Sequence, residues 1–164
     1  MDHRLYLLFP TVLVLLFLTG CPDGTPSEPG TVTFDDMEAR AVDLVNAERK
    51  LYQLSQLKVQ SDIRTAARLH SQDMAENNYF SHTNMEGLSF SERLENLDTS
   101  WKKAGENLAY NNNALDPAEA AVSSWINSPE HHDNLLTEDF THTGIGVGLS
   151  EKGTYFFTQI FIGK

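Results

Sequence analysis

Residues 144–162, GIGVGLSEKGTYFFTQIFI, decide the fold of this chain. The polar, glycine-containing stretch 150–154 separates two apolar runs, 144–149 and 154–162, which is the pattern of a β-hairpin. The second run is apolar on both faces of a strand, with Tyr155, Phe157 and Phe161 on one face and Phe156, Ile160 and Ile162 on the other. A strand that is covered on both faces implies helices above and below its sheet.

Helical periodicity accounts for most of the chain that precedes this hairpin. Apolar residues repeat at helical spacing over 35–52, 61–77 and 118–126, and a short helix is expected from Ser89 to Leu97. Thr33, Ser61, Ser89, Asp116 and Ser128 are the residue types that cap helix N-termini, and a helix from Pro129 to Leu136 is expected after Ser128. Residues 105–110 are expected to add a further strand.

Composition excludes several classes of function. The formal net charge of the 164 residues is −11, which disfavours contact with a phosphate backbone, so no nucleic-acid partner is expected. Cys21 is the only cysteine, so no disulfide forms within the chain and no zinc site is built from cysteines.

The amino terminus has the pattern of an export signal. Residues 5–18 form an apolar run that is too short to span a bilayer and suits a signal peptide. The run ends in Leu18-Thr19-Gly20-Cys21, which resembles the lipobox of bacterial lipoproteins, where the cysteine is acylated. The alternative is an ordinary signal peptide with an incidental cysteine. We therefore expect a lipoprotein signal peptide (1–20), a lipidated cysteine with a flexible tether (21–33) and one folded domain (34–164).

Candidate chemistry is limited to histidine and glutamate side chains near turns. The sequence has no G-x-S-x-G, H-E-x-x-H or phosphate-binding loop motif. His82 follows two aromatic residues in a loop, Glu106 follows a glycine, and His131 lies at a helix start, where neutral imidazole is favoured. Neutral imidazole binds zinc or acts as a general base, but the spacing alone does not show that these side chains meet.

Other polar and aromatic residues have simpler interpretations. His70 lies on the apolar stripe of its helix and is expected to be a core histidine with a bonded ring nitrogen, and Trp125 is expected in the core. Asn107 is expected to fix a turn, and Trp101 either borders a cleft or packs beneath its loop. No role is assigned to the two remaining histidines of the C-terminal half, His132 and His142.

Seven short stretches follow one another along the chain: 45–49 (VNAER), 69–75 (LHSQDMA), 79–82 (YFSH), 105–109 (GENLA), 125–131 (WINSPEH), 144–148 (GIGVG) and 157–161 (FTQIF). In this order they resemble the bacterial branch of the CAP superfamily of SCP-like extracellular domains. The resemblance implies an α+β fold: a three-layer α-β-α sandwich with a small, mainly antiparallel sheet between helices.

The resemblance also implies a surface cleft with two histidines and two glutamates that holds a divalent metal. The matching stretches assign His82, Glu106 and His131 to this cleft. The second glutamate has no counterpart, because the helix ends Trp125-Ile126-Asn127-Ser128, and Glu130 stands where the bacterial motif has glycine.

Three functions remain open at this stage. The favoured hypothesis is an exported, membrane-anchored binding domain, a cell-envelope lipoprotein whose cleft holds zinc or another divalent metal, a lipid or an envelope component. The alternatives are a metal-dependent hydrolase with Glu106 as base, and a non-catalytic scaffold for protein contact. Binding is favoured over catalysis because the second glutamate is missing.

Overall fold

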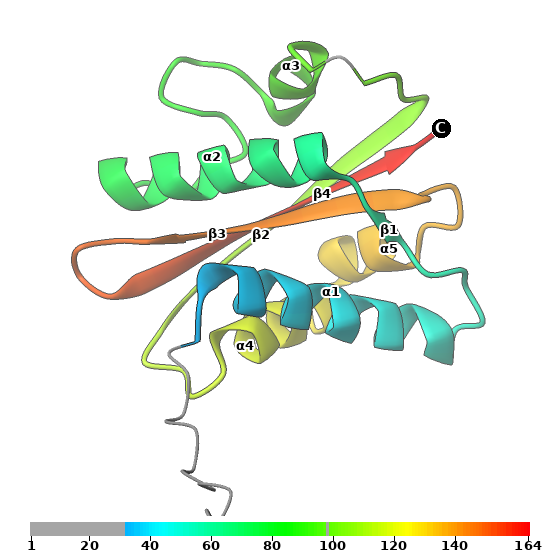
Figure 1. Cartoon of the computed structure of the whole chain (residues 1–164), viewed down its shortest axis with the longest axis horizontal. Coiled ribbons are helices and arrows are strands. Elements are labelled where there is room, and N and C mark those ends of the chain that lie inside the picture. Colours follow the sequence, from blue (N-terminus) through cyan, green and yellow to red (C-terminus); the bar gives the residue numbers. More distant parts are fainter. Residues whose placement is uncertain (1–31, 98) are drawn as a thin grey trace, which may run out of the picture. The chain divides into compact units, whose positions relative to one another are not determined.

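A four-stranded sheet built around the C-terminal hairpin forms the middle layer of the domain (Figure 1). The computed structural model describes residues 32–97 and 99–164. Within these residues the elements are α1 (Phe34–Leu51), β1 (Lys58–Val59), α2 (Ser61–Asn77), α3 (Phe90–Glu95), β2 (Lys103–Asn112), α4 (Pro117–Ile126), α5 (Pro129–Leu136), β3 (His142–Leu149) and β4 (Thr154–Gly163). The expected C-terminal hairpin and the expected strand over 105–110 are therefore confirmed.

The sheet is mainly antiparallel, in the strand order β1-β3-β4-β2. β4 pairs antiparallel with both β3 and β2, whereas β1 adds only a short parallel pairing to β3. This order leaves β2 at one edge of the sheet, so side chains from both of its faces can reach the same rim.

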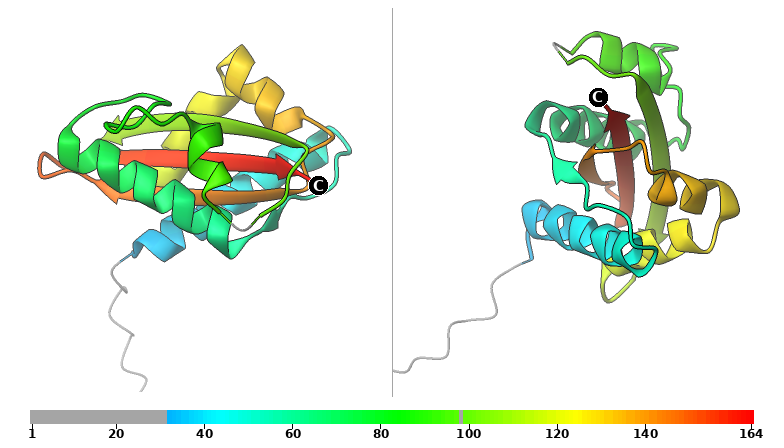
Figure 2. Two further views of the ribbon diagram at one scale, coloured as in Figure 1. Left: turned by 90° about the horizontal axis from the view of Figure 1, so that it is seen from above. Right: turned by 90° about the vertical axis from the view of Figure 1, so that its right-hand side faces the viewer.

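Helices cover both faces of the sheet. Figure 1 shows α2 and α3 on one face and α1, α4 and α5 on the other, and the end-on view in Figure 2 shows the same three layers. Phe157 and Phe161 of β4 are buried in the core with α1 and α4, and Ile160 and Ile162 are buried against α2 and α3. The expected α-β-α sandwich is confirmed, since burial on both faces of β4 requires two helical layers.

Glycines of β3 allow α2 to lie directly on the sheet. A Cβ atom added at Gly146 would lie 2.1 Å from the backbone nitrogen of Arg68 on α2, and one at Gly144 would lie 2.2 Å from that of Arg64. Only glycine permits this approach of helix and strand backbones, which explains why the stretch GIGVG has a small residue at every second position.

Helix starts were mostly predicted correctly. Thr33 and Ser89 form complete capping boxes, and the Asp116 side chain accepts the backbone N–H of Glu119. Ser61 was expected to cap α2, but Gln60 is the N-cap. The reason is a tertiary contact. The backbone N–H of Gln60 donates to Thr143 O at 3.0 Å, which continues the β1–β3 pairing and holds Gln60 in an extended conformation.

Two further helix ends differ in detail from the expectation. Ser128 is the N-cap of α5, as expected, but its side chain makes no capping hydrogen bond. α3 ends at Glu95 rather than Leu97, although Leu97 still packs against the cluster of Ile160 and Ile162. Hydrophobic contact therefore continues beyond the last helical turn.

A buried cation links α1 to the segment after α5. The Arg49 guanidinium donates to the carbonyl oxygens of Ser55, Leu135, Thr137 and Phe140, at distances between 2.7 and 3.3 Å. Burial lowers the pKa of Arg49. Arg49 thus serves four backbone carbonyls, of which Thr137 O also accepts the backbone N–H of Phe140 at 3.4 Å.

Nothing in the described part of the chain is a helix long and apolar enough to span a bilayer. The signal peptide, Cys21 and most of the tether lie outside the described residues, so those expectations stay predictions.

Candidate functional site

A carboxylate–imidazole pair lies at the edge strand β2. Glu106 Oε1 is 2.8 Å from His82 Nδ1, and Glu106 Oε2 is 2.5 Å from an amino group of Arg93. The Glu106 side chain is 0% exposed, whereas that of His82 is 53% exposed. Glu106 Oε1 accepts a hydrogen bond from His82 Nδ1, and in the Nδ1–H tautomer of an imidazole the lone pair lies on Nε2.

Arg93 fixes the loop that carries His82. Its second amino group donates to His82 O at 2.8 Å and to Leu88 O at 3.2 Å, while its first binds the Glu106 carboxylate. Arg93 projects from α3, whose start is fixed by the capping box of Ser89 and Glu92. The capping of a six-residue helix thus determines where this guanidinium lies, and through it the position of His82.

His131 reaches the same edge from the opposite helical layer. Its carbonyl accepts from Asn107 Nδ2 at 3.0 Å, and Asn134 Nδ2 donates to Asn107 Oδ1 at 2.9 Å. Asn107 directly follows Glu106 on β2. The expectation that Asn107 fixes a turn was therefore wrong: it is fully buried in a strand and ties α5 to the sheet.

The two imidazoles interact electrostatically. Burial lowers the pKa of His131, a proton on His82 would lower it further, and the Glu130 carboxylate acts in the opposite direction. His131 is therefore held in its neutral, ligating form near neutral pH. The His82 side chain and the His131 backbone are thus bonded to two successive residues of β2, Glu106 and Asn107, and a cleft shared by the two imidazoles stays a prediction.

The donor set is smaller than that of a closed metal site. Within residues 32–97 and 99–164 no group of three or more His, Cys, Asp or Glu side chains is arranged to hold a metal. Both oxygens of Glu106 are engaged, so Glu106 orients His82 rather than contacting an ion. Glu130 is exposed on α5, and α4 ends at Ile126 without a carboxylate. Two imidazoles fit only a divalent ion whose remaining ligands are water or a bound molecule.

The other histidines and the tryptophans among the described residues make structural contacts. His70 is buried and its Nε2 lies 2.9 Å from Ser81 O, so its expected core position is confirmed. Trp125 is also buried as expected, and it donates to Leu108 O. Trp101 packs against the cluster under α2 and α3, His132 bonds to Glu48, and His142 to the Thr141 hydroxyl.

Arg93 and Asn134 were missed by sequence reasoning. Arg93 lies 13 residues before Glu106 and Asn134 lies 27 residues after Asn107. Side-chain pairing across such separations leaves no local periodic signal, and the expected short helix from Ser89 was the sign of an ordered element beside Arg93.

The fold defines the class of protein as an α-β-α sandwich domain. The family model described as "CAP: Cysteine-rich secretory protein family" matches residues 42–161. The chain belongs to this family.

Bacterial relatives agree with this membership. The uncharacterized protein YkwD of Bacillus subtilis (strain 168) is 39% identical over 140 residues, which cover 85% of this chain and 51% of YkwD. A Bacillus anthracis extracellular protein containing an SCP domain has a solved structure with a TM-score of 0.67 and 35% identity, covering 82% of this chain and 45% of that one. The chain therefore spans about half the length of these relatives.

A more distant structure matches along almost its whole length. An outer surface protein of Borrelia burgdorferi gives a TM-score of 0.72 at 20% identity, covering 82% of this chain and 98% of that one. At this identity the likeness concerns the fold alone.

Proposed function

We propose that this protein is an exported, membrane-anchored CAP domain that binds a ligand at the cleft formed by His82 and His131. The simplest ligand is a divalent metal ion such as zinc. The other candidate ligands are a lipid and an envelope component that contacts the same two imidazoles. Export is supported by the signal-like amino terminus and by the extracellular designation of the Bacillus anthracis relative. Anchoring is proposed through acylation of Cys21, because two or more acyl chains give a durable attachment.

The observation that carries the proposal is the contact between His82 Nδ1 and Glu106 at 2.8 Å. A carboxylate that holds one ring nitrogen directs the lone pair of the other nitrogen outward and makes it a better ligand. Because the imidazole is half exposed while its carboxylate is fully buried, the ligating nitrogen is the part of the pair open to solvent. A purely structural His–Glu pair would not require an exposed imidazole.

The described residues suit a weakly held, exchangeable ion. His82 and His131 would hold it, and Glu106 and Asn107 would keep the two histidine-bearing segments in position. A bound zinc ion would act as a Lewis acid that attracts carboxylate, phosphate or carbonyl oxygens. Its open coordination positions would then be available to an envelope component.

Binding is favoured over hydrolysis by the state of Glu106. The hydrolase hypothesis requires this carboxylate as a general base, with a free oxygen within hydrogen-bond reach of a water molecule. Its two oxygens are instead bonded to His82 and Arg93, and the side chain is fully buried. Acid–base work by Glu106 would require the Arg93 ion pair to break first.

Calorimetric titration of the purified protein with zinc tests the cleft. We expect micromolar binding that is lost in the His82→Ala, His131→Ala double variant and retained in His142→Ala, which removes a histidine at the start of β3. Equal zinc affinity in the double variant would refute the cleft. Failure of zinc to bind the unaltered protein would remove the metal proposal, and transfer of a labelled lipid would then be measured with the same variants.

Anchoring has a separate test. Cys21→Ser should move the protein from the membrane fraction to the soluble exported fraction, and inhibition of lipoprotein signal peptidase should leave a larger precursor. An unchanged size and membrane partition under both treatments would exclude acylation at Cys21.

A further inference from the structure

The domain has a groove at the point where the described part of its chain begins. Val32, the first described residue, lines this groove together with the first turns of α1 and α4, the loop 114–116 and Tyr155 of β4. The volume is about 540 Å³, and we call it the amino-terminal groove. Leu115 is fully exposed beside it, and Val32 is 63% exposed. Two apolar side chains therefore face solvent at one groove.

The loop that carries Leu115 is held in place on both sides. Before the loop, Asn111 Nδ2 donates to Pro117 O at 2.9 Å. After it, the Asp116 carboxylate accepts a hydrogen bond from Arg40 Nε on α1 at 3.3 Å. The exposure of Leu115 is thus a property of an ordered loop, and apolar groups that gather on an ordered surface mark a contact with a partner or a membrane.

The chain before Val32 indicates which partner covers the groove. Cys21, the proposed acylation site, lies eleven residues before Val32, and eleven residues span at most about 40 Å. Acyl chains on Cys21 would therefore keep the amino-terminal groove within that distance of the bilayer, whichever way the domain turns. Because a tether raises the effective concentration of the two surfaces, a small apolar contact is sufficient for docking.

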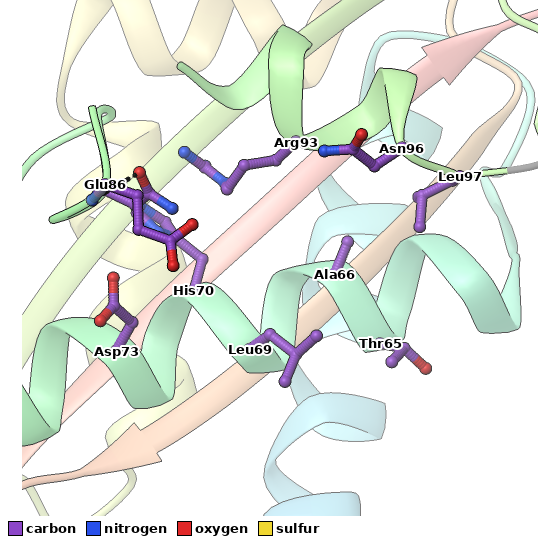
Figure 3. Close-up of a pocket in the computed structure, with 10 residues that line it drawn as sticks. Thr65, Ala66, Leu69, His70, Asp73, Glu86, Arg93, Asn96 and Leu97 are labelled. Carbon is purple, nitrogen blue, oxygen red and sulfur yellow. Dashed lines mark hydrogen bonds between the residues drawn. The ribbon is translucent and has the colours of Figure 1, made fainter. Parts of the chain in front are cut away.

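A hollow on the other helical layer has a different character. The pocket between α2 and the segment 84–97 has a volume of about 420 Å³ and is lined by Asp73, Glu86 and Arg93 as well as by apolar residues. Figure 3 shows Asp73 and Glu86 toward the same end of this pocket. Charged groups lose hydration when they enter hydrocarbon, so this face is the one expected to stay in water.

Charge determines which lipid surface suits the amino-terminal groove. Two acids, Asp36 and Asp116, and one base, Arg40, line it, and Arg40 pairs with Asp116. Hydrogen bonds from Thr33 lower the pKa of Asp36, which therefore stays ionised. The net charge of the chain is −11, so an anionic leaflet would repel this face.

We propose that the amino-terminal groove docks on the zwitterionic lipid surface of the membrane that anchors the protein. Leu115 and Val32 insert at the boundary between headgroups and acyl chains, and Tyr155 lies at the headgroup level that tyrosine favours. In the cell this docking rests on the proposed attachment through Cys21. It would turn the helical layer of α2 and α3 away from the membrane.

Quenching of tryptophan fluorescence by brominated phosphatidylcholine tests the docking. The mature chain, 21–164, is coupled through the Cys21 thiol to a maleimide phospholipid in phosphatidylcholine vesicles, so attachment does not depend on acylation by the cell. Leu115→Trp should lose fluorescence beyond the loss of the unaltered protein. Leu51→Trp is the matched control, because Leu51 is 76% exposed at the other end of α1, about 25 Å from Phe34, and it should show no added loss. Equal quenching at both positions, or none at position 115, would overturn the proposal.

A second reporter measures the contribution of Leu115. In a Val32→Trp protein, adding Leu115→Ser should lower the ratio of docked to undocked domains about tenfold, because one leucine side chain no longer leaves water, whereas adding Leu51→Ser should not change it. Phosphatidylglycerol in the vesicles should weaken the quenching. An unchanged ratio in Leu115→Ser, or stronger quenching on phosphatidylglycerol, would refute the docking surface. Docking of the coupled protein, combined with a soluble protein in cells, would support the surface and exclude only the acylation.

Discussion

Removing the buried ion pair between Glu106 and Arg93 one partner at a time should destabilise the fold far more than removing both. The Glu106 side chain is 0% exposed and that of Arg93 is 11% exposed. Loss of one partner of a buried pair costs about 3–5 kcal/mol, because the remaining charge is left without compensation. Arg93 retains two carbonyl acceptors and some water contact, so Glu106→Leu should cost about 3 kcal/mol, the lower end of that range.

The double variant Glu106→Leu, Arg93→Met replaces both charges with apolar side chains. Replacing a buried pair by hydrophobic residues is often nearly neutral, so the double variant should be about 2–3 kcal/mol more stable than Glu106→Leu alone. Urea unfolding followed by circular dichroism measures this directly. With a slope of about 2 kcal/mol per molar urea, 3 kcal/mol moves the midpoint by about 1.5 M.

An exposed pair in the same domain serves as the control. Lys103 and Asp139 lie 3.1 Å apart, but their side chains are 49% and 73% exposed. Their double-mutant cycle should give an interaction of less than about 1 kcal/mol. The reasoning is refuted if the Glu106–Arg93 interaction is as small as this control, or if the single and double variants are simply additive.

Three further predictions concern the core. Gly146→Ala should lower the free energy of unfolding by about 3 kcal/mol, because the new Cβ would lie 2.1 Å from the Arg68 backbone. Gly87→Ala should lower it by about 1 kcal/mol, because Gly87 has a φ of 85° but open space around it. Equal losses in the two variants would contradict this reasoning. Arg49→Met should lose about 3–5 kcal/mol in the same assay, since four carbonyls each lose a charged donor, and a loss below about 1 kcal/mol would exclude the role assigned to Arg49. The folded-state pKa of His70 lies below its ordinary value of 6.5, so the unfolded chain binds more protons there, and stability should fall as the pH drops below about 6.5. Urea midpoints at several pH values should show a smaller pH slope in His70→Gln, and an unchanged slope would show that His70 does not contribute.

The sequence predicted the layers because burial leaves a periodic record. β4 is apolar at both odd and even positions, and only a strand between two helical layers can bury both sets. Capping boxes at Thr33 and Ser89 were predictable for the same reason, since each depends on residues within one turn. The wrong prediction of Ser61 as an N-cap shows the limit of local reasoning. The start of α2 is fixed by the backbone N–H of Gln60, which is bonded to β3.

The site was predictable in part. His82, Glu106 and His131 were selected by residue type and by resemblance, but neither reveals which atoms are free. That the second oxygen of Glu106 belongs to Arg93 follows from the path of the 83–89 loop, which has no periodic pattern. The buried acceptor on His70 was equally hidden, because the apolar stripe of α2 predicts burial of the ring without naming the partner of each nitrogen.

The strength of the Glu106–Arg93 pair also limits the chemistry of the cleft. A carboxylate acts as a general base only while one of its oxygens is free to accept a proton. If releasing Glu106 from Arg93 costs about 3 kcal/mol, the base-competent arrangement is populated in roughly one molecule in a hundred. Holding His82 in the Nδ1–H tautomer requires no such release, because the bonded arrangement is the one that orients the ring. The same ion pair that makes Glu106 a poor base therefore makes it an effective support for a ligand-binding imidazole.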